Sequence, residues 1–326
     1  MMRAAWYDHQ GPAAEVLQVG ELPVPEPGPG DVRVRVHFSG VNPGDTKKRV
    51  DRFGIGMPFP RVVPHSDGSG VIDSVGEGVD AGRVGQRVWV YGAQSYRPFG
   101  TAAQLTVVPA EQAVELPQDV SDEVGACLGI PGITAHRAVF GDGPVTGTTV
   151  LVHGVLGGVG SLAAQLARWG GAEVIATVRR SSDIEAVDPA VATHVVALDQ
   201  PDPARQIRGH APDGVDRVVE VAFSDNVDLD AAVAANNAVI AVYGTRDDRP
   251  VLPFRPLLWA NVTLRLLGSD DFAVAAKREA ASALTTALRD GMLSTPTGDP
   301  LPLDRIAEAH DRVDAGTRER VLICLP

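Results

Sequence analysis

The chain has 326 residues, which predicts about two domains at roughly 150 residues each. Its formal net charge is −12 and aromatic residues make up only 5%, so we expect no nucleic-acid partner. The two cysteines, Cys127 and Cys324, exclude a disulfide framework and a cysteine-rich zinc lobe. No apolar run approaches the ~18 residues of a membrane span, and no signal segment opens the chain, so we expect a cytoplasmic protein without a membrane partner.

The first 120 residues predict a β-rich unit. Strand-like runs at 32–37, 70–75 and 87–91 are separated by turns rich in glycine and proline, such as 23–30. Short strands between such turns are typical of a barrel or a sandwich.

Strands and helices alternate from about residue 148 onward. A helix is expected over 160–169, and strands are expected at 148–153, 173–178, 195–197, 216–221, 238–243 and 264–267. Continuous apolar strands alternating with helices indicate a parallel sheet covered on both faces. Two further helices, 273–289 and 304–314, precede a last apolar strand at 320–324. That strand needs a sheet partner, for which the N-terminal β-rich unit is a candidate.

A glycine-rich turn between the strand 148–153 and the helix after it is the strongest local signal. It reads Gly154-Val155-Leu156-Gly157-Gly158-Val159-Gly160. Glycines there let the backbone approach a pyrophosphate, whose charge is met by the helix N-terminus. The G-x-G-x-x-G pattern fails only at its first position, Val155. The alternative is a tight turn without a ligand, but the flanking strand and helix favour dinucleotide binding.

The next predicted strand, 173–178, runs into the basic turn Arg179-Arg180-Ser181. In this kind of fold an acidic residue at that place holds the ribose 2′-hydroxyl of NAD, whereas arginine favours the 2′-phosphate of NADP. Two guanidinium groups can hold a phosphate, and a hydroxyl adds a donor. NADP is therefore preferred, with a solvated basic turn as the alternative.

Motifs along almost the whole chain resemble one family. They are Ser39-Gly40-Val41-Asn42-Pro43-Gly44-Asp45, Pro64-His65-Ser66-Asp67-Gly68, Val75-Gly76-Glu77-Gly78, Val84-Gly85-Gln86-Arg87-Val88, Gly100-Thr101-Ala102, Gly132-Ile133-Thr134-Ala135 and the glycine-rich turn. The chain resembles the medium-chain dehydrogenase/reductase superfamily and is most similar to its zinc-independent, zeta-crystallin-like quinone oxidoreductases.

This resemblance implies an α/β fold with a GroES-like β-rich catalytic domain and a Rossmann domain built on a doubly wound parallel sheet. The catalytic domain would comprise 1–121 and a return segment, 267–326, and the Rossmann domain 122–266, with the cofactor in the cleft between them. A homodimer is implied as well, often formed through an edge of the Rossmann sheet. Either the strand 238–243 or the strand near Leu264 could be that edge.

The implied cofactor is NADPH, and the matching positions give its contacts. They are Thr134, Gly157, Gly158, Val159, Arg179, Arg180, Ser181, Asn226, Tyr243, Gly244, Thr245, Gly268 and Ser269. Most of them follow predicted parallel strands, where dinucleotides bind.

Zinc dehydrogenases of this superfamily carry a cysteine in the segment that matches 40–45, where this chain has Asn42-Pro43. They also use a His-Glu pair, whereas His65 is followed by Ser66-Asp67. We therefore predict no metal site. Without a Lewis acid to stabilise an alkoxide, oxidation of an alcohol is disfavoured. Reduction of a quinone or an enone is favoured, because these acceptors delocalise the developing negative charge.

The expected reaction is hydride transfer from C4 of NADPH to such a small-molecule acceptor. Asn42 is the residue expected to donate to the acceptor oxygen, and turn formation before Pro43 is its alternative role. Asp45 and His65 are weaker pocket candidates. The proton would come from solvent, because Tyr91 and His136 are better explained by core packing or a surface position.

Two other functions remain open at this point. The first is an enoyl-thioester reductase on the same scaffold, which would need a placed acid and a larger acyl cleft. The second is a non-catalytic, crystallin-like NADPH-binding protein with a structural or RNA-associated role.

Overall fold

Alternating valines build the antiparallel sheet of the N-terminal unit. In the computed structural model, which describes residues 1–326, the longest strand is β3 (Asp31–Gly40). Val32, Val34 and Val36 lie in the core at no more than 2% exposure, because successive side chains of a strand point to opposite faces. The sheet has the order β14-β15-β3-β4-β5-β7, and β6 also pairs with β3.

The other strands and helices of this unit have nine residues or fewer. A separate two-stranded sheet joins β1 (Met2–Trp6) to β2 (Gln18–Leu22). The remaining strands are β4 (Asp67–Val75), β5 (Arg87–Val90), β6 (Leu105–Pro109), β7 (Ala113–Glu115), β14 (Leu301–Pro302) and β15 (Leu322–Cys324). The helices are α1 (Ala13–Val16), α2 (Pro43–Arg49), α3 (Asp122–Gly125) and α10 (Ile306–Asp314).

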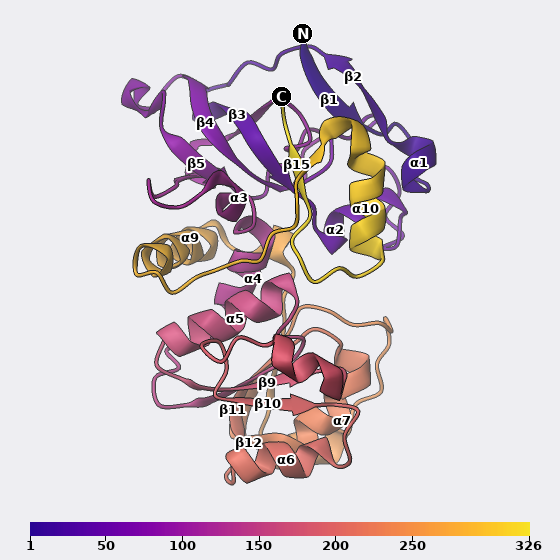
Figure 1. Ribbon diagram of the computed structural model, residues 1–326, viewed down its shortest axis with the longest axis vertical. Coiled ribbons are helices and arrows are strands. Elements are labelled where there is room, and N and C mark those ends of the chain that lie inside the picture. Colours follow the sequence, from indigo (N-terminus) through magenta and orange to yellow (C-terminus); the bar gives the residue numbers. More distant parts are fainter. The chain divides into compact units, whose positions relative to one another are not determined.

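The end of the chain returns to this N-terminal unit. The strand β15 pairs antiparallel with β3, with Ile323 opposite Ser39. The helix α10 contacts α1 and α2, so the yellow C-terminal segment lies beside indigo and purple N-terminal elements in Figure 1. The prediction that the last strand finds its partner in the N-terminal β-rich unit is confirmed.

The second unit contains a six-stranded, fully parallel sheet of order β10-β9-β8-β11-β12-β13. Its strands are β8 (Thr149–Val152), β9 (Glu173–Val178), β10 (His194–Ala197), β11 (Val215–Glu220), β12 (Ala234–Val242) and β13 (Thr263–Leu266). Its helices are α4 (Gly129–Phe140), α5 (Gly158–Trp169), α6 (Pro203–His210), α7 (Phe223–Val233), α8 (Phe254–Trp259) and α9 (Val274–Arg289).

Helices cover both faces of this parallel sheet. The chain runs outward from β8 through β9 to β10, then crosses to β11 and continues to β12 and β13. Because right-handed crossovers in opposite directions put helices on opposite faces, α5 lies on one face and α6 and α7 on the other (Figure 1). This is the doubly wound arrangement expected from the sequence.

The contacts within the chain divide it into Met1–Ile130 with Thr295–Pro326, and Pro131–Ser294. The domain boundaries that the sequence predicts are 121/122 and 266/267. The helix α9 packs close to α4, because an added Cβ at Gly132 would meet Leu284 of α9 at 2.9 Å. None of the helices combines the length and apolar character that crossing a lipid bilayer requires.

Candidate functional site

The glycine-rich turn connects β8 to α5 through a left-handed residue, Gly154, at φ +66°. Gly157 is the N-cap of α5, and Gly158 and Val159 form its first turn. A Cβ at Gly160 would collide with the carbonyl oxygen of Gly154, so only glycine lets the helix approach the turn this closely. The first N–H groups of a helix have no intrahelical partner, and they attract an anion such as pyrophosphate.

The basic turn follows β9 as the sequence predicts. Arg179 and Arg180 are exposed. The charge of Arg180 interacts with the carboxylate of Asp199. The next residue, Ser181, is hydrogen-bonded to Asp199. Ser181 N donates to Asp199 Oδ1 at 2.9 Å and to Oδ2 at 3.1 Å, and Ser181 Oγ donates to Oδ1 at 2.6 Å. The hydroxyl that was expected to serve a phosphate is therefore bonded to a carboxylate.

Other predicted cofactor residues lie at or after the ends of neighbouring parallel strands. Asn226 is on α7, which follows β11; Tyr243, Gly244 and Thr245 follow β12; Gly268 and Ser269 follow β13. A Cβ at Gly244 would collide with the Val221 carbonyl oxygen, so two loops approach each other closely there. The carboxyl ends of parallel strands share one edge, so the structure brings these loops and the glycine-rich turn together. Thr134, on α4, is 5% exposed.

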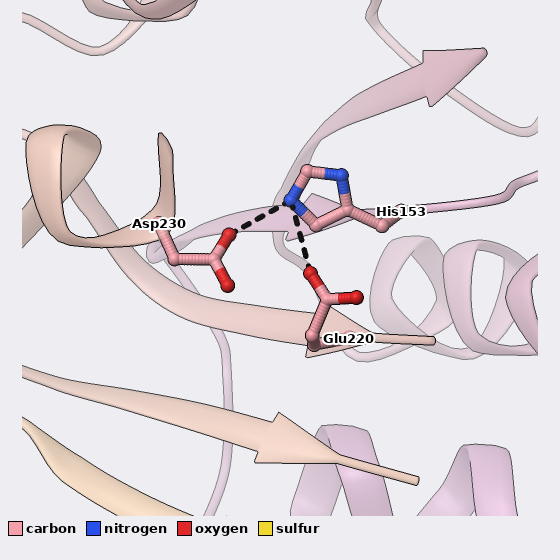
Figure 2. Close-up of side chains that lie close together, drawn as sticks. All are labelled: His153, Glu220 and Asp230. Atoms are coloured by element: carbon pink, nitrogen blue, oxygen red, sulfur yellow. Dashed lines mark hydrogen bonds and ion pairs between the residues drawn. The ribbon is translucent and has the colours of Figure 1, made fainter. Parts of the chain in front are cut away.

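Three buried ionisable side chains lie at this edge of the sheet, and the sequence analysis did not select them. His153 directly follows β8, Glu220 ends β11, and Asp230 is on α7; all are at most 1% exposed. His153 Nε2 lies 2.9 Å from Asp230 Oδ1 and 3.5 Å from Glu220 Oε2, between the two carboxylates in Figure 2. The signal available in the sequence was an acidic residue, Glu220, that directly follows two valines near the end of the predicted strand.

These three side chains, which we call the buried triad, fix the loops around the cofactor edge. His153 Nδ1 is hydrogen-bonded to Thr177 Oγ1 of β9 at 2.8 Å. Glu220 Oε1 accepts from the Ala222 amide and from Asn226 Nδ2, the latter at 3.2 Å. The triad therefore ties β8, β9, β11 and α7 to one another beneath the predicted cofactor residues.

Burial and charge set the protonation of the triad. Burial raises the pKa of Glu220 to about 7, and the positive charge of His153 opposes that rise. Burial by itself would lower the pKa of His153, but the charge and hydrogen bond of Asp230, with the charge of Glu220, raise it above the usual value. The donor atoms of the triad lie within 4.8 Å of one another, a spacing compatible with a bound cation. One hydrogen bond, from His153 Nε2 to Asp230 Oδ1, joins members of the triad, and Asp230 Oδ2 is buried without a hydrogen-bond partner.

The predicted catalytic residues are buried in the other unit. Asn42 is the N-cap of α2, and its backbone N–H donates to Asp45 Oδ2 at 2.8 Å. Asn42 Nδ2 donates to Asp67 Oδ2 at 2.6 Å, while Asn42 Oδ1 is buried without a hydrogen-bond partner. The structure therefore brings Asn42 and Asp45 together at the start of α2 and adds Asp67, which the sequence analysis did not select.

His65 lies within a chain of hydrogen bonds that all run in one direction. Arg49 can only donate, so His310 Nδ1 accepts from Arg49 Nε at 3.2 Å, and His310 Nε2 carries the proton that is donated to His65 Nε2 at 2.9 Å. His65 Nδ1–H then donates to Ser39 Oγ at 2.8 Å. His65 is fully buried and has a left-handed backbone at φ +75°, and burial lowers its pKa to about 3, so its ring is neutral.

The residues in this region do not fit a catalytic zinc ion. Both ring nitrogens of His65 are hydrogen-bonded to other side chains, and Asp67 accepts from Asn42 and from the Ile130 amide at 2.8 Å. Cys127 Sγ is bonded to the Glu123 carbonyl at 3.1 Å, and burial raises the pKa of its thiol, which disfavours the thiolate that a metal requires.

Neither side chain considered as a proton donor is well placed for that role. Tyr91 is 2% exposed, and its hydroxyl donates to the Glu111 carbonyl at 3.3 Å. His136 lines a cavity of about 310 Å³ in the parallel-sheet unit, together with Phe140, Trp169 and Glu279. Burial lowers the pKa of His136 to about 4, so its ring is neutral at physiological pH.

Comparisons with known proteins agree with this architecture. Residues 28–118 match the family described as alcohol dehydrogenase GroES-like domain, and residues 158–282 match that described as zinc-binding dehydrogenase. The quinone oxidoreductase of Mus musculus is 30% identical over 95% of this chain and 93% of its own length. That of Homo sapiens is 30% identical over 97% of this chain and 95% of its own length.

Solved structures agree over the whole chain. A mycobacterial protein complexed with NADPH is 28% identical, with a TM-score of 0.84 and 100% of both chains covered. A structure described as an NAD-dependent alcohol dehydrogenase is 27% identical, with a TM-score of 0.88 and the same coverage. The chain thus belongs to the quinone oxidoreductase family of the medium-chain dehydrogenase/reductase superfamily and is a nicotinamide-dinucleotide-dependent oxidoreductase.

Proposed function

We propose that the protein is an NADPH-dependent reductase of a quinone or an α,β-unsaturated carbonyl and that it works without a metal. The observation that carries the choice of NADPH is the pair of exposed guanidinium groups of Arg179 and Arg180 directly after β9. Support for the acceptor class comes from the relatives that are named quinone oxidoreductases.

In this proposal the parallel-sheet unit binds and orients the cofactor. The glycine-rich turn offers its N–H groups to the pyrophosphate, and Arg179 and Arg180 hold the 2′-phosphate bidentately. The buried triad keeps Asn226 of α7 and the glycine-rich turn in place. Bound NADPH supplies the hydride.

The acceptor oxygen is polarised by Asn42 in this proposal. The Nδ2 group carries two N–H donors, and one of them is satisfied by Asp67 at 2.6 Å. The second is the donor that we assign to the acceptor oxygen, where negative charge develops. Asp45 and the neutral His65 hold the surrounding turns, and solvent supplies the proton.

The test is an NADPH-oxidation assay with quinones, simple enones and enoyl thioesters, each repeated with NADH, on protein whose zinc content has been measured. We expect quinones or enones to be reduced by zinc-free protein. Activity confined to enoyl thioesters would favour the enoyl-reductase alternative, and cofactor binding without any oxidation would favour a non-catalytic role. One zinc ion per chain with activity that depends on it would contradict the metal-free proposal.

We also propose that two copies of the chain associate through β13. This strand is an edge of the parallel sheet, paired only with β12, whereas β12, the other candidate from the sequence, is an interior strand. Near this edge in sequence, Phe254, Trp259 and Leu266 are 70%, 74% and 75% exposed. Unpaired strand edges with exposed apolar side chains favour association. The cytoplasmic location stays a prediction from the sequence.

A further inference from the structure

The turn after β9 binds a carboxylate of the protein itself, that of Asp199. The carboxylate of Asp199 accepts three hydrogen bonds from Ser181, two from the amide N–H at 2.9 and 3.1 Å and one from Oγ at 2.6 Å. Gln200 Nε2 donates to the same Ser181 Oγ at 2.5 Å. Asp199 is thus bound to Ser181 as an external oxyanion would be.

This carboxylate is ionised at neutral pH. The hydrogen bonds from the Ser181 side chain and amide, and more weakly the charge of Arg180, hold the pKa of Asp199 below its usual value. A phosphate monoester at the same turn would be a second anion. It would be repelled by Asp199 and would find the N–H and O–H of Ser181 already used.

We propose that Asp199 is a specificity-determining residue that competes with the 2′-phosphate of the cofactor for the N–H and O–H of Ser181. The inference rests on the proposed function, which places the 2′-phosphate at the turn of Arg179, Arg180 and Ser181. NADH leaves the contact between Asp199 and Ser181 intact. NADPH has to displace Asp199 before Ser181 can join the two arginines around the phosphate.

The position of Asp199 in the fold allows this displacement. Asp199 is exposed and follows β10, which is an edge strand of the sheet. Its side chain can therefore turn into solvent without breaking a strand pair. The protein accordingly accepts both cofactors, and Asp199 lowers the preference for NADPH that Arg179 and Arg180 create.

The experiment compares cofactor binding to the wild-type chain and to Asp199→Asn. Asparagine can still accept a hydrogen bond from Ser181 but carries no charge. We expect NADPH to bind about 10-fold more tightly to the variant, the effect of removing one like charge at hydrogen-bond range, and NADH to change by less than about 2-fold. The same ratio is expected for the fragments 2′,5′-ADP and 5′-AMP.

Asp188→Asn is the matched control, because Asp188 is also exposed and accepts one backbone N–H, from Ala190 at 2.8 Å. It should leave both affinities unchanged. Asp199→Ser provides a second variant with the same expected direction. An equal change for NADPH and NADH, or weaker NADPH binding, would overturn the role of Asp199. Absence of reductase activity with every acceptor, despite tighter 2′,5′-ADP binding, would instead reject the proposed function and leave this role standing.

Discussion

At the scale of single residues, the arginine pair after β9 decides between the two cofactors. We expect Arg179→Ala with Arg180→Ala to weaken NADPH binding about 100-fold, because two charge-assisted hydrogen-bonding groups are lost. NADH binding should change by less than about 2-fold, since NADH has no 2′-phosphate. Titration of both cofactors into the same preparation measures the ratio and provides its own control. Equal losses for the two cofactors would mean that the turn is only a solvated basic surface.

The sequence alone predicted the basic turn but not its acidic neighbour. Arg179 and Arg180 directly follow an apolar strand, so their place at the sheet edge could be inferred. Asp199 lies 18 residues beyond Ser181, and it comes close only because β10 pairs in parallel with β9, with Ala197 beside Val178. Strand register is a tertiary property, and the pattern of apolar residues in one strand does not specify it.

At the scale of elements, the buried triad links β8, β11 and α7 and makes stability depend on pH. Glu220 has an ordinary pKa of about 4.5 when unfolded and about 7 when folded. Between these values the unfolded chain releases a proton that the folded chain keeps. The contribution of Glu220 to the free energy of unfolding is therefore complete below pH 4.5 and is lost as pH rises through 7, by at most ~1.4 kcal/mol per pH unit. The raised pKa of His153 acts in the same direction.

Glu220→Gln should remove this contribution of Glu220, because glutamine keeps an acceptor for Asn226 but does not titrate. From pH 5 to pH 8, we expect the free energy of unfolding of the wild type to fall relative to that of the variant. Denaturant unfolding at each pH measures it. Glu308→Gln is the control, since Glu308 is an exposed carboxylate paired with Arg305 and Arg312. A pH-independent difference for Glu220→Gln would show that the triad does not exchange protons in this range.

The strands and helices were largely predictable from the sequence, but the elements with which each one pairs or packs were not. The apolar run 320–324 indicated a strand in need of a partner, and the structure gives it β3. The choice between 238–243 and the strand near Leu264 as the sheet edge stayed open, because strand order depends on the direction of each crossover. The same limit applies to α9, whose helical pattern was clear while its packing partner, the region of Gly132, was not.

At the scale of the whole molecule, composition and packing both support our proposal that the protein works without a catalytic zinc ion. Cysteine scarcity predicted the absence of a cysteine-rich site. In the structure, His65 Nδ1 is hydrogen-bonded to Ser39 and His65 Nε2 is hydrogen-bonded to His310. These two hydrogen bonds leave neither ring nitrogen of His65 free for a metal ion.

The assembly of two chains through β13 is the prediction that belongs to this scale. Leu266→Asp places a charge on an apolar strand edge, where association would have to desolvate it, so we expect dimerisation to weaken at least about 100-fold. Sedimentation velocity over a range of concentrations should show the wild type as two chains and the variant as one. Ile55→Asp is the matched control, because Ile55 is 64% exposed in the other unit and should leave the dimer intact. A monomeric wild type, or a dimeric Leu266→Asp variant, would place the contact elsewhere or remove it.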